Sequence, residues 1–369
     1  MAVLDVLTMG RVGVDIYPLQ TGVGLADVTS FGKYLGGSPT NVAVASARYG
    51  RSAAVITKTG DDPFGQYVRR ALGEYGVDPR HVGVSGVAPT PVTFCEIFPP
   101  DDFPLHFYRL PLAPDLDIRP EELDLDAVAS ARIFWMSGTG LSAEPSRSAT
   151  LAALRHRNRT GTTVFDLDWR PMFWQGAYAG GREVRPGEAA AEARTYYREA
   201  LAHATVAVGN REECEVATGE SEPYAAARAL LEFGVGLAVV KQGPKGVLAM
   251  DRSGTAVEVP PAPVEVVNGL GAGDAFGGAL CHGLLAGWEL ARVMRFANAA
   301  GAIVAGALAC SDAMPDAAAV EAKIAESAGA AESAGAGGAQ QDRGGRADRA
   351  DQGDQAEQGV RRGQGVQGV

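Results

Sequence analysis

Short apolar segments alternate with longer stretches of helical periodicity along most of this chain of 369 residues. Segments with few polar interruptions are typical of strands buried on both faces of a sheet. The stretches between them repeat apolar residues at the three- and four-residue spacing of a helix with one buried face. Strands and helices that alternate in this way predict an α/β fold with a mostly parallel central sheet, flanked by helices on both faces. The predicted strands are Val3–Met9, Ala53–Lys58, Ile133–Met136, Val164–Leu167, Val206–Val208, Leu237–Val240, Thr255–Val259 and Val264–Val267. The predicted helices are Thr40–Tyr49, Phe64–Gly76, Glu188–Ala202, Glu212–Thr218, Pro223–Phe233 and two that begin at Asp274 and Glu289.

Two segments interrupt this alternation. Asp15–Leu35 and Thr90–Leu110 are rich in Thr, Val, Phe and Tyr, are broken by Gly and Pro, and lack long helical periodicity. We expect them to leave the main domain as strands and to form a small β-sheet that covers the site as a lid.

The last part of the chain has a different composition. Ser327–Val369 consists mostly of Ala, Gly, Gln, Asp and Arg, with three valines and no Leu, Ile, Met or aromatic residue. Such a segment cannot bury enough apolar surface to offset the entropy lost on ordering. The sequence therefore predicts one folded domain over residues 1–326, which includes the lid, and a disordered low-complexity tail over 327–369.

Charge and composition exclude several classes of function. The net charge is −11, which argues against binding to nucleic acid. No apolar run approaches the roughly 20 residues that a membrane span needs, and the first residues lack the basic and apolar regions of a secretory signal. The four cysteines have no paired spacing, so we expect reduced, buried thiols in a cytoplasmic protein. They are Cys95, Cys214, Cys281 and Cys310.

The segment Asn268–Gly278 carries the strongest chemical signal. It reads Asn-Gly-Leu-Gly-Ala-Gly-Asp-Ala-Phe-Gly-Gly, a glycine-rich turn that leads into an apolar helix. Small residues expose backbone N–H groups, and a helix N-terminus attracts anions, so the segment predicts a phosphate site. Asp274 is a carboxylate beside that site, which would repel phosphate unless it had a role, such as taking a proton from an attacking hydroxyl. The alternative is a flexible turn with Asp274 as an ordinary helix cap.

A second motif lies about 230 residues earlier and reads Gly36-Gly37-Ser38-Pro39-Thr40-Asn41. With both motifs in this order, the chain resembles the ribokinase/PfkB family of carbohydrate kinases from about Val6 to Pro315. The resemblance implies an α/β fold with a β-sheet lid, ATP and Mg²⁺ as cofactors, a small-molecule sugar substrate, and a homodimer formed through the lid.

The resemblance also implies roles for the residues of both motifs. Asp274 corresponds to the general base, and Gly271, Ala272 and Gly273 supply amides to the transferred phosphate. Asp15 and Asn41 hydrogen-bond substrate hydroxyls, while Gly36 and Gly37 leave room for the sugar. The alternative for Asp15 and the glycines is a purely structural strand end and turn.

Several cations indicate the class of substrate. Arg109 lies in the predicted lid, and Arg170 follows Asp166-Leu167-Asp168-Trp169 at the end of a predicted strand. An arginine fork matches a carboxylate, and kinases of keto-deoxy sugar acids carry arginines in similar surroundings. Lys33 is a third candidate cation, and Asp168 could orient Arg170 or bind a hydroxyl. The alternative for each arginine is a solvated surface charge.

The nucleotide side is predicted from two further segments. Asn210-Arg211-Glu212-Glu213 follows a predicted strand with the family's spacing, so Asn210 would contact phosphate and Glu213 would organise Mg²⁺ through water. In Lys241–Gly246, the resemblance assigns Lys241, Gly243 and Gly246 to the nucleotide. Asn298 would border the adenine pocket, or would be a buried helix residue without such a role.

One position departs from the family pattern. Many members begin the late signature with Asp-Thr, and that position contributes to activation by monovalent cations in some of them. This chain has Asn268-Gly269 instead, which puts potassium dependence in doubt.

The sequence therefore favours an ATP-dependent kinase that phosphorylates a keto-deoxy sugar acid of inositol catabolism. The alternatives are a kinase of another keto-deoxy sugar acid, a neutral-sugar kinase and a catalytically silent sugar-binding protein. A nucleotide-binding dehydrogenase is disfavoured, because the first strand ends in Gly10-Arg11-Val12-Gly13 and not in a Gly-x-Gly-x-x-Gly turn.

Overall fold

The computed structural model describes residues 3–109, 112–174 and 186–329. The chain divides into two units, Met1–Ala325 and Glu326–Val369. Of the predicted tail, residues 330–369 lie outside the described residues, as does Leu110 at the end of the second predicted lid segment.

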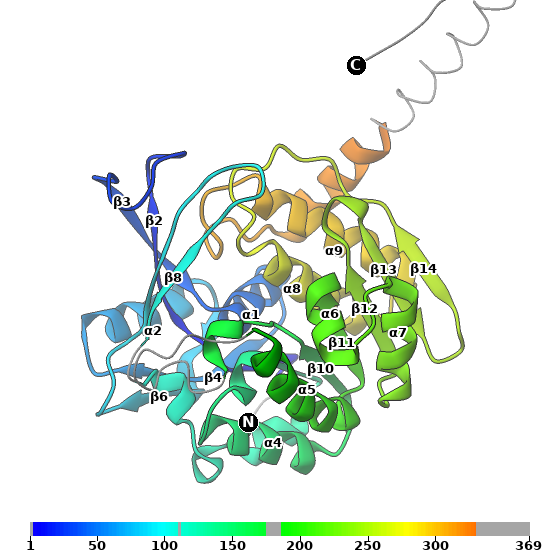
Figure 1. Cartoon of the computed structure of the whole chain (residues 1–369), viewed down its shortest axis with the longest axis horizontal. Coiled ribbons are helices and arrows are strands. Elements are labelled where there is room, and N and C mark those ends of the chain that lie inside the picture. The colour runs from blue at the N-terminus through cyan, green and yellow to red at the C-terminus, as the bar shows by residue number, and fades with distance from the viewer. Residues whose placement is uncertain (1–2, 110–111, 175–185, 330–369) are drawn as a thin grey trace, which may run out of the picture. The chain divides into compact units, whose positions relative to one another are not determined.

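A large sheet forms the centre of the first unit (Figure 1). Within the described residues it has ten strands, in the order β14-β13-β12-β11-β10-β9-β1-β4-β5, with β6 paired to β4. All neighbours are parallel except the pairs that involve β13, which form an antiparallel edge. The strands are β1 (Val6–Met9), β4 (Ala53–Gly60), β5 (Val77–Asp78), β6 (Val82–Ser85), β9 (Ile133–Ser137), β10 (Thr162–Asp166), β11 (Val206–Asn210), β12 (Leu237–Lys241), β13 (Val247–Asp251) and β14 (Ala256–Val259).

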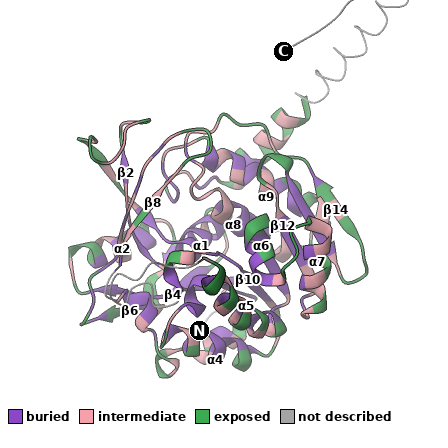
Figure 2. Ribbon diagram, in the orientation of Figure 1, coloured by how far each residue is buried: buried purple, intermediate pink, exposed green. Residues whose placement is uncertain are grey.

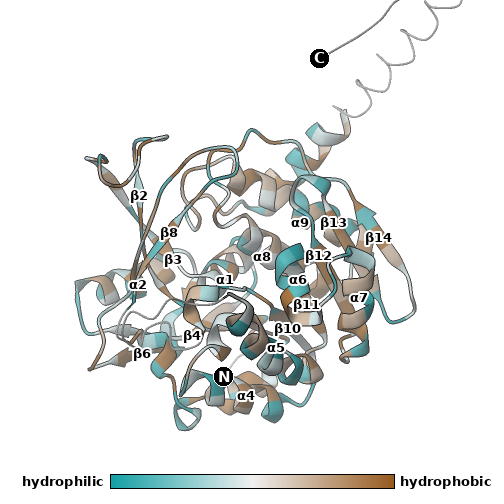
Figure 3. Ribbon diagram, viewed as in Figure 1, coloured by the Kyte–Doolittle hydropathy of each residue, from teal (hydrophilic) through white to brown (hydrophobic). Residues whose placement is uncertain are grey.

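Helices cover both faces of this sheet, because successive residues of its strands point to opposite sides. In β1, Val6 belongs to one apolar cluster and Leu7 to the other, and both are fully buried. Figure 2 shows the central elements as mostly buried, and Figure 3 shows hydrophilic and hydrophobic residues together on α5 and α6. The first face is covered by α1 (Ser38–Arg48), α2 (Pro63–Glu74), α8 (Ala272–Leu285) and α9 (Leu290–Ala305). The second is covered by α3 (Leu125–Ser130), α4 (Ser146–Arg157), α5 (Pro186–His203), α6 (Arg211–Thr218) and α7 (Pro223–Glu232). None of the described helices is both long and apolar enough to cross a membrane.

A second, smaller sheet has the strand order β3-β2-β7-β8. Within the same unit, an apolar cluster that includes Tyr17, Cys95, Ile97 and Cys310 joins this sheet to the segment after α9. The predicted α/β fold with a separate small sheet is therefore confirmed. The strands are β2 (Gly13–Pro18), β3 (Phe31–Gly36), β7 (Val92–Cys95) and β8 (Leu105–Tyr108).

One predicted strand is wrong. Val264–Val267 forms no strand within the described part of the chain. Pro261 and Pro263 precede it and cannot donate to a ladder, and the Val267 amide instead bonds the Ala305 carbonyl oxygen at 2.9 Å. The segment therefore crosses the end of α9 and lines a cavity there.

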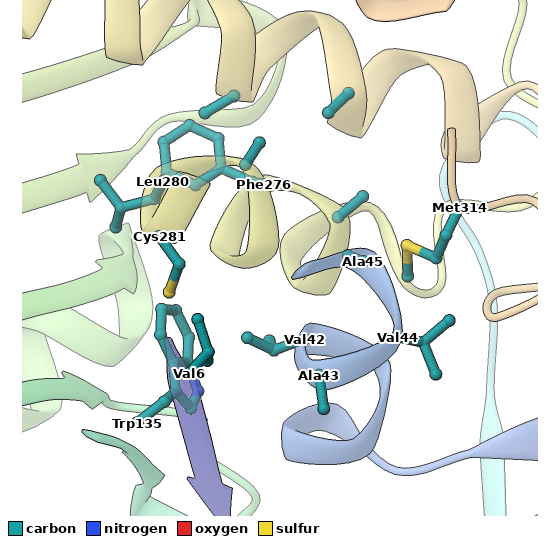
Figure 4. Packing of buried hydrophobic residues seen from close by; sticks show 14 of the residues in the cluster. Val6, Val42, Ala43, Val44, Ala45, Trp135, Phe276, Leu280, Cys281 and Met314 are labelled. Carbon is teal, nitrogen blue, oxygen red and sulfur yellow. The ribbon is translucent and has the colours of Figure 1, made fainter. Parts of the chain in front are cut away.

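Helices α1 and α8 pack unusually close together. A Cβ atom at Gly278 would lie 2.3 Å from the Cβ of Ala45, and one at Gly277 would lie 2.7 Å from the Trp135 ring. Figure 4 shows Phe276 and Cys281 of α8 on the same cluster as Val42 of α1. Gly278 therefore lets α8 lie directly against Ala45 of α1, and Gly277 lets it lie against Trp135 of β9.

Candidate active site

A cavity of about 820 Å³ opens at the carboxyl ends of the parallel strands, bordered by the small sheet. This is the edge at which open α/β sheets bind ligands. Gly36, Lys33 and Arg109 are the predicted site residues that do not line it. Those that do are Asp15, Gly37, Asn41, Asp168, Arg170, Asn210, Glu213, Lys241, Gly243, Gly246, Gly271, Ala272, Gly273, Asp274 and Asn298.

The first turn of α8 points free amides at this cavity. Gly271 is the N-cap residue, with a φ of +81°, and no side chain caps the helix. The first intrahelical bond runs from the Ala275 amide to the Gly271 carbonyl oxygen at 2.9 Å. The amides of Ala272, Gly273 and Asp274 therefore have no partner in the helix and, with its dipole, favour an anion.

Asp274 is held in this turn by two residues of α1. Ser38 Oγ donates to Asp274 Oδ1 and Asn41 Nδ2 donates to Oδ2, each at 2.7 Å. Burial raises the pKa of the Asp274 carboxyl above its usual value, while the hydrogen bonds from Asn41 and Ser38 limit that rise. The carboxylate is thus fixed in direction and more basic than a free aspartate, which suits a general base.

Lys241, the last residue of β12, brings a cation to the same place. Its Nζ lies 3.3 Å from the position that a Cβ at Gly273 would take. Although burial opposes the charged form, Asp166 and Glu213 raise the pKa of Lys241 above its usual value. The amine therefore stays protonated beside the free amides and adds to their attraction for an anion.

Three acidic side chains surround the strand ends of β10 and β11. Asp168 Oδ1 lies 3.1 Å from Arg170 Nη2, and Arg170 Nη1 lies 3.7 Å from Glu213 Oε1. Despite burial, Arg170 and then Arg11 hold the pKa of Asp168 below its usual value. Asp166 differs, because burial and the neighbouring acids raise its pKa to about 8 against the opposing effect of Lys241.

Asp15, on β2, enters from the small sheet. Tyr17 Oη donates to Asp15 Oδ2 at 2.7 Å. Burial raises the pKa of Asp15 to about 6, and the Tyr17 hydrogen bond and Arg11 oppose that rise. Gly36 does not line the cavity itself, but a Cβ there would lie 2.2 Å from the Asp15 carboxyl group, so the glycine is needed for Asp15 to fit.

The structure places two predicted cations away from the cavity. Arg109 Nη2 bonds Asp115 Oδ2 at 2.7 Å, with both side chains 2% exposed, and its guanidinium lies over the Phe173 ring. Lys33 is exposed, with its Nζ 3.8 Å from the centre of the Tyr67 ring. In this structure both cations are engaged by protein groups.

Sequence reasoning missed Arg11, which lines the cavity beside Asp168, at 3.6 Å from Nη2 to Oδ2. Its position directly after Gly10, at the carboxyl end of the first strand, was the available signal. It also assigned no separate role to Ser38 or Asp166, although both stand within the motifs.

Main-chain geometry shapes the end of the cavity at which the residues predicted to bind the nucleotide lie. Asn210 and Glu213 cap α6 reciprocally, through bonds of 2.6 and 2.8 Å. Gly246 has a φ of +88°, and a Cβ there would meet the Val259 carbonyl oxygen at 2.0 Å. Asn298 lines the cavity while its Nδ2 donates to the carbonyl oxygens of Val259 and Pro260, at 3.3 and 3.0 Å.

Comparisons with known proteins agree with this fold. The family model described as "pfkB family carbohydrate kinase" matches residues 3–317. A 5-dehydro-2-deoxygluconokinase of Clostridium perfringens is 32% identical over 323 residues, which cover 86% of this chain and 91% of that protein. A fructokinase of Xylella fastidiosa with bound ATP has a TM-score of 0.74 at 24% identity and covers 88% of this chain and 100% of its own. A fructokinase double mutant of Vibrio cholerae in a fructose-, ADP- and potassium-bound form has a TM-score of 0.73 at 25% identity, with coverage of 87% and 99%.

The family match and these relatives identify the class of protein as a carbohydrate kinase, a phosphotransferase that acts on an alcohol group. The chain belongs to the pfkB family of carbohydrate kinases.

Proposed function

We propose that this kinase transfers the γ-phosphoryl group of ATP to the terminal C6 hydroxyl of 5-dehydro-2-deoxygluconate in inositol catabolism. The observation that carries the phosphotransfer is Asp274, oriented by Ser38 and Asn41 at the free amides of α8. The choice of acceptor is supported by the names of relatives such as that from Clostridium perfringens.

In this proposal, the Asp274 carboxylate takes the proton of the C6 hydroxyl as the oxygen attacks the γ-phosphorus. The bond between that phosphorus and the bridging oxygen breaks, and ADP leaves with the electron pair. The amides of Ala272 and Gly273 and the Lys241 ammonium stabilise the charge on the transferred group. Asp15 and Asn41 orient the sugar hydroxyls.

The acidic residues near β10 and β11 fit a magnesium ion that arrives with ATP. Magnesium keeps several waters and takes few protein ligands, and among the described residues no three His, Cys, Asp or Glu side chains converge on one point. Asp166 and Glu213 would hold it, with Glu213 acting through water because Asn210 and Arg170 engage its carboxylate. The ion would neutralise charge on the phosphates.

An assay over a panel of acceptors tests this function. Purified enzyme is given Mg-ATP with 5-dehydro-2-deoxygluconate, 2-dehydro-3-deoxygluconate, fructose and ribose, and ADP release is followed. We expect kcat/KM to be highest for 5-dehydro-2-deoxygluconate. A preference for 2-dehydro-3-deoxygluconate or for a neutral sugar would replace the assignment within the family, and no turnover of any acceptor would contradict it.

We propose further that this enzyme needs no monovalent cation, because Asn268 does not fit one. It is 1% exposed; its Nδ2 donates to the Leu308 carbonyl oxygen at 2.8 Å, and its Oδ1 accepts the Leu270 amide at 3.0 Å. A cation needs carbonyl and carboxylate oxygens as ligands, whereas here the Asn268 side-chain N–H group already occupies the Leu308 carbonyl oxygen. The neutral amide thus holds the loop that leads into α8.

Exchange of this amide for a carboxylate tests the idea. We expect Asn268→Asp to lower turnover several-fold and the melting temperature by several degrees, because a carboxylate oxygen then faces the Leu308 carbonyl oxygen. Added potassium should restore both quantities. Wild type and Asn268→Ala should not respond to potassium beyond an ionic-strength control with tetramethylammonium. A potassium-dependent rise in wild-type turnover or melting temperature would contradict the proposal.

We also propose a cytoplasmic homodimer that pairs through the small sheet. On one face of that sheet, Phe31, Phe94 and Tyr108 form an aromatic row with ring centres 5.7 and 5.4 Å apart. Tyr108 is 67% exposed and Phe31 is 38% exposed, so the row presents apolar surface that a second copy could bury. All four cysteines are free and buried, as expected in a reducing compartment.

A further inference from the structure

Arg11 stands where the chain passes from β1 of the large sheet to β2 of the small one. Thr40 Oγ1 donates to its carbonyl oxygen at 3.2 Å, and a Cβ at Gly37 would lie 2.4 Å from the same oxygen. Gly37 has a φ of +108° and begins the helix that carries Ser38 and Asn41. The main chain of Arg11 is therefore fixed against the residues that orient the catalytic Asp274.

The guanidinium of Arg11 retains donors that the protein does not use. Its Nη2 lies 3.6 Å from Asp168 Oδ2, longer than an ordinary N–H···O bond. Among the contacts of the described residues, its buried Nε has no hydrogen-bond partner. A buried donor without an acceptor has lost its bonds to water and gained none, so a ligand oxygen at this place is favoured. The plane of the group lies near Phe107 of β8, 5.6 Å from the ring centre.

Arg170, the second arginine that lines the cavity, is held more tightly, and Arg109 does not line the cavity. Arg109 is paired with Asp115 outside the cavity lining, although its Nε also has no hydrogen-bond partner among the described residues. Arg170 donates to the Trp169 carbonyl oxygen at 2.7 Å and contacts Asp168 and Glu213. Asp168 meets the two cavity arginines on opposite oxygens, Arg11 on Oδ2 and Arg170 on Oδ1. Thr139 Oγ1 anchors Asp168 through a 2.7 Å bond to Oδ2. Asp168 thus sets two guanidinium groups side by side on the cavity wall.

We propose that Arg11, beside Arg170, binds the carboxylate of the sugar acid and selects it over neutral sugars. The assignment rests on the proposed function. A planar fork with unused N–H groups accepts a carboxylate through two parallel hydrogen bonds, whereas a hydroxymethyl group offers neither charge nor that geometry. Because Phe107 covers the guanidinium, the same contact links the bound carboxylate to the small sheet.

The test compares two acceptors, 5-dehydro-2-deoxygluconate and its analogue with a hydroxymethyl group in place of the carboxylate. Arg11→Gln should lower kcat/KM for the acid by about 10- to 150-fold, mainly through KM, as for a lost hydrogen bond to a charged group. For the analogue, kcat/KM should change less than about threefold. Arg11→Lys should recover only part of the loss, because an ammonium lacks the fork. Arg155→Gln, an exposed arginine of α4, is the matched control and should leave both values unchanged.

Equal losses on the acid and the analogue would overturn the proposal and make Arg11 a structural residue. The melting temperature and its rise with Mg-ATP show whether Arg11→Gln is folded; if it is not, Arg11→Lys gives the same comparison with the charge kept. Full activity of Arg11→Gln on the acid would also overturn the proposal. If the wild-type enzyme turns over no keto-deoxy sugar acid, the proposed function is refuted instead. The wild-type assay alone gives this result, so the two failures can be told apart.

Discussion

The two sheets of this enzyme differ in how their side chains are used. The inner strands of the large sheet are buried on both faces, as in β4, where all residues are buried. In the small sheet, β7 alternates intermediate and buried residues, and β8 alternates intermediate and exposed ones. The large sheet supplies Lys241 and Asp166 at its carboxyl edge, while the small sheet supplies Asp15 and Phe107. We infer that the phosphotransfer groups depend on the large sheet and its helices, and that recognition of the sugar and of a second copy depends on the small sheet.

The largest effect is expected for the carboxylate in the first turn of α8. Asp274→Asn keeps the shape of the side chain but removes the proton acceptor, so turnover should fall at least about 100-fold while ATP and sugar acid still bind. Single-turnover kinetics and calorimetric titration of both ligands measure the two quantities.

A control variant removes the charge of a carboxylate at the N-terminus of another helix. Asp62 caps α2 by accepting the Gly65 amide at 2.8 Å and does not line the cavity. Asp62→Asn should retain most activity, because asparagine caps as well as aspartate. Near-normal turnover of Asp274→Asn would remove Asp274 from the mechanism and leave it a structural hydrogen-bond partner of Ser38 and Asn41.

A smaller effect is expected for Asp15→Asn in the small sheet, which should raise stability and weaken binding of the sugar acid. Its pKa is raised to about 6, mainly by burial, so the folded state holds this proton more tightly than the unfolded state. As pH rises from about 4 to 6, the Asp15 carboxyl ionises in the unfolded chain before it does in the folded protein, so the free energy of unfolding falls. Asp15→Asn lacks this penalty. Its melting temperature should therefore exceed that of wild type by an amount that grows from pH 4 to 6, reaches a few degrees and then stays level.

The same substitution should weaken binding of the substrate. An amide accepts less strongly than a carboxylate from sugar hydroxyls, so KM for the sugar acid should rise about tenfold with a smaller change in kcat. Thermal melts across this pH range and steady-state kinetics at pH 7.5 test both parts. Asp62→Asn again serves as the control, since hydrogen bonds hold the pKa of Asp62 below its usual value and no stability gain is expected there. If the difference in melting temperature between Asp15→Asn and wild type does not change with pH, this result would count against the raised pKa of Asp15.

Sequence patterns predicted the large sheet well because burial on both faces leaves a continuous apolar run at each strand. They failed where local chemistry overrode that pattern. Val264–Val267 looks like a strand, but the nearby prolines direct it across α9. Helix α4, Ser146–Arg157, was not predicted, because Ser, Thr and Arg interrupt its apolar face.

The site was predictable to the extent that it depends on main-chain motifs. The glycine-rich turn and its carboxylate could be located from residue types and spacing alone, since both act through a helix N-terminus. The choice among arginines could not. Arg109 has a suitable place in the sequence, yet Asp115 occupies its guanidinium, and Arg11 is brought to Asp168 only when distant strands align. Which cation stays available is a property of tertiary packing.

The smallest effect on catalysis is expected at the outer face of the small sheet. Tyr108→Ser removes the most exposed ring of the aromatic row formed with Phe31 and Phe94, and should raise the dissociation constant of the proposed dimer about tenfold or more. The melting temperature at high protein concentration should change little, because the side chain is 67% exposed and contributes little to the core. Sedimentation velocity over a concentration series measures the association, with Val3→Ser, another exposed apolar residue, as the control. If wild type sediments as a monomer, or if Tyr108→Ser associates as wild type does, the small sheet is not the dimer interface and its role is confined to the sugar.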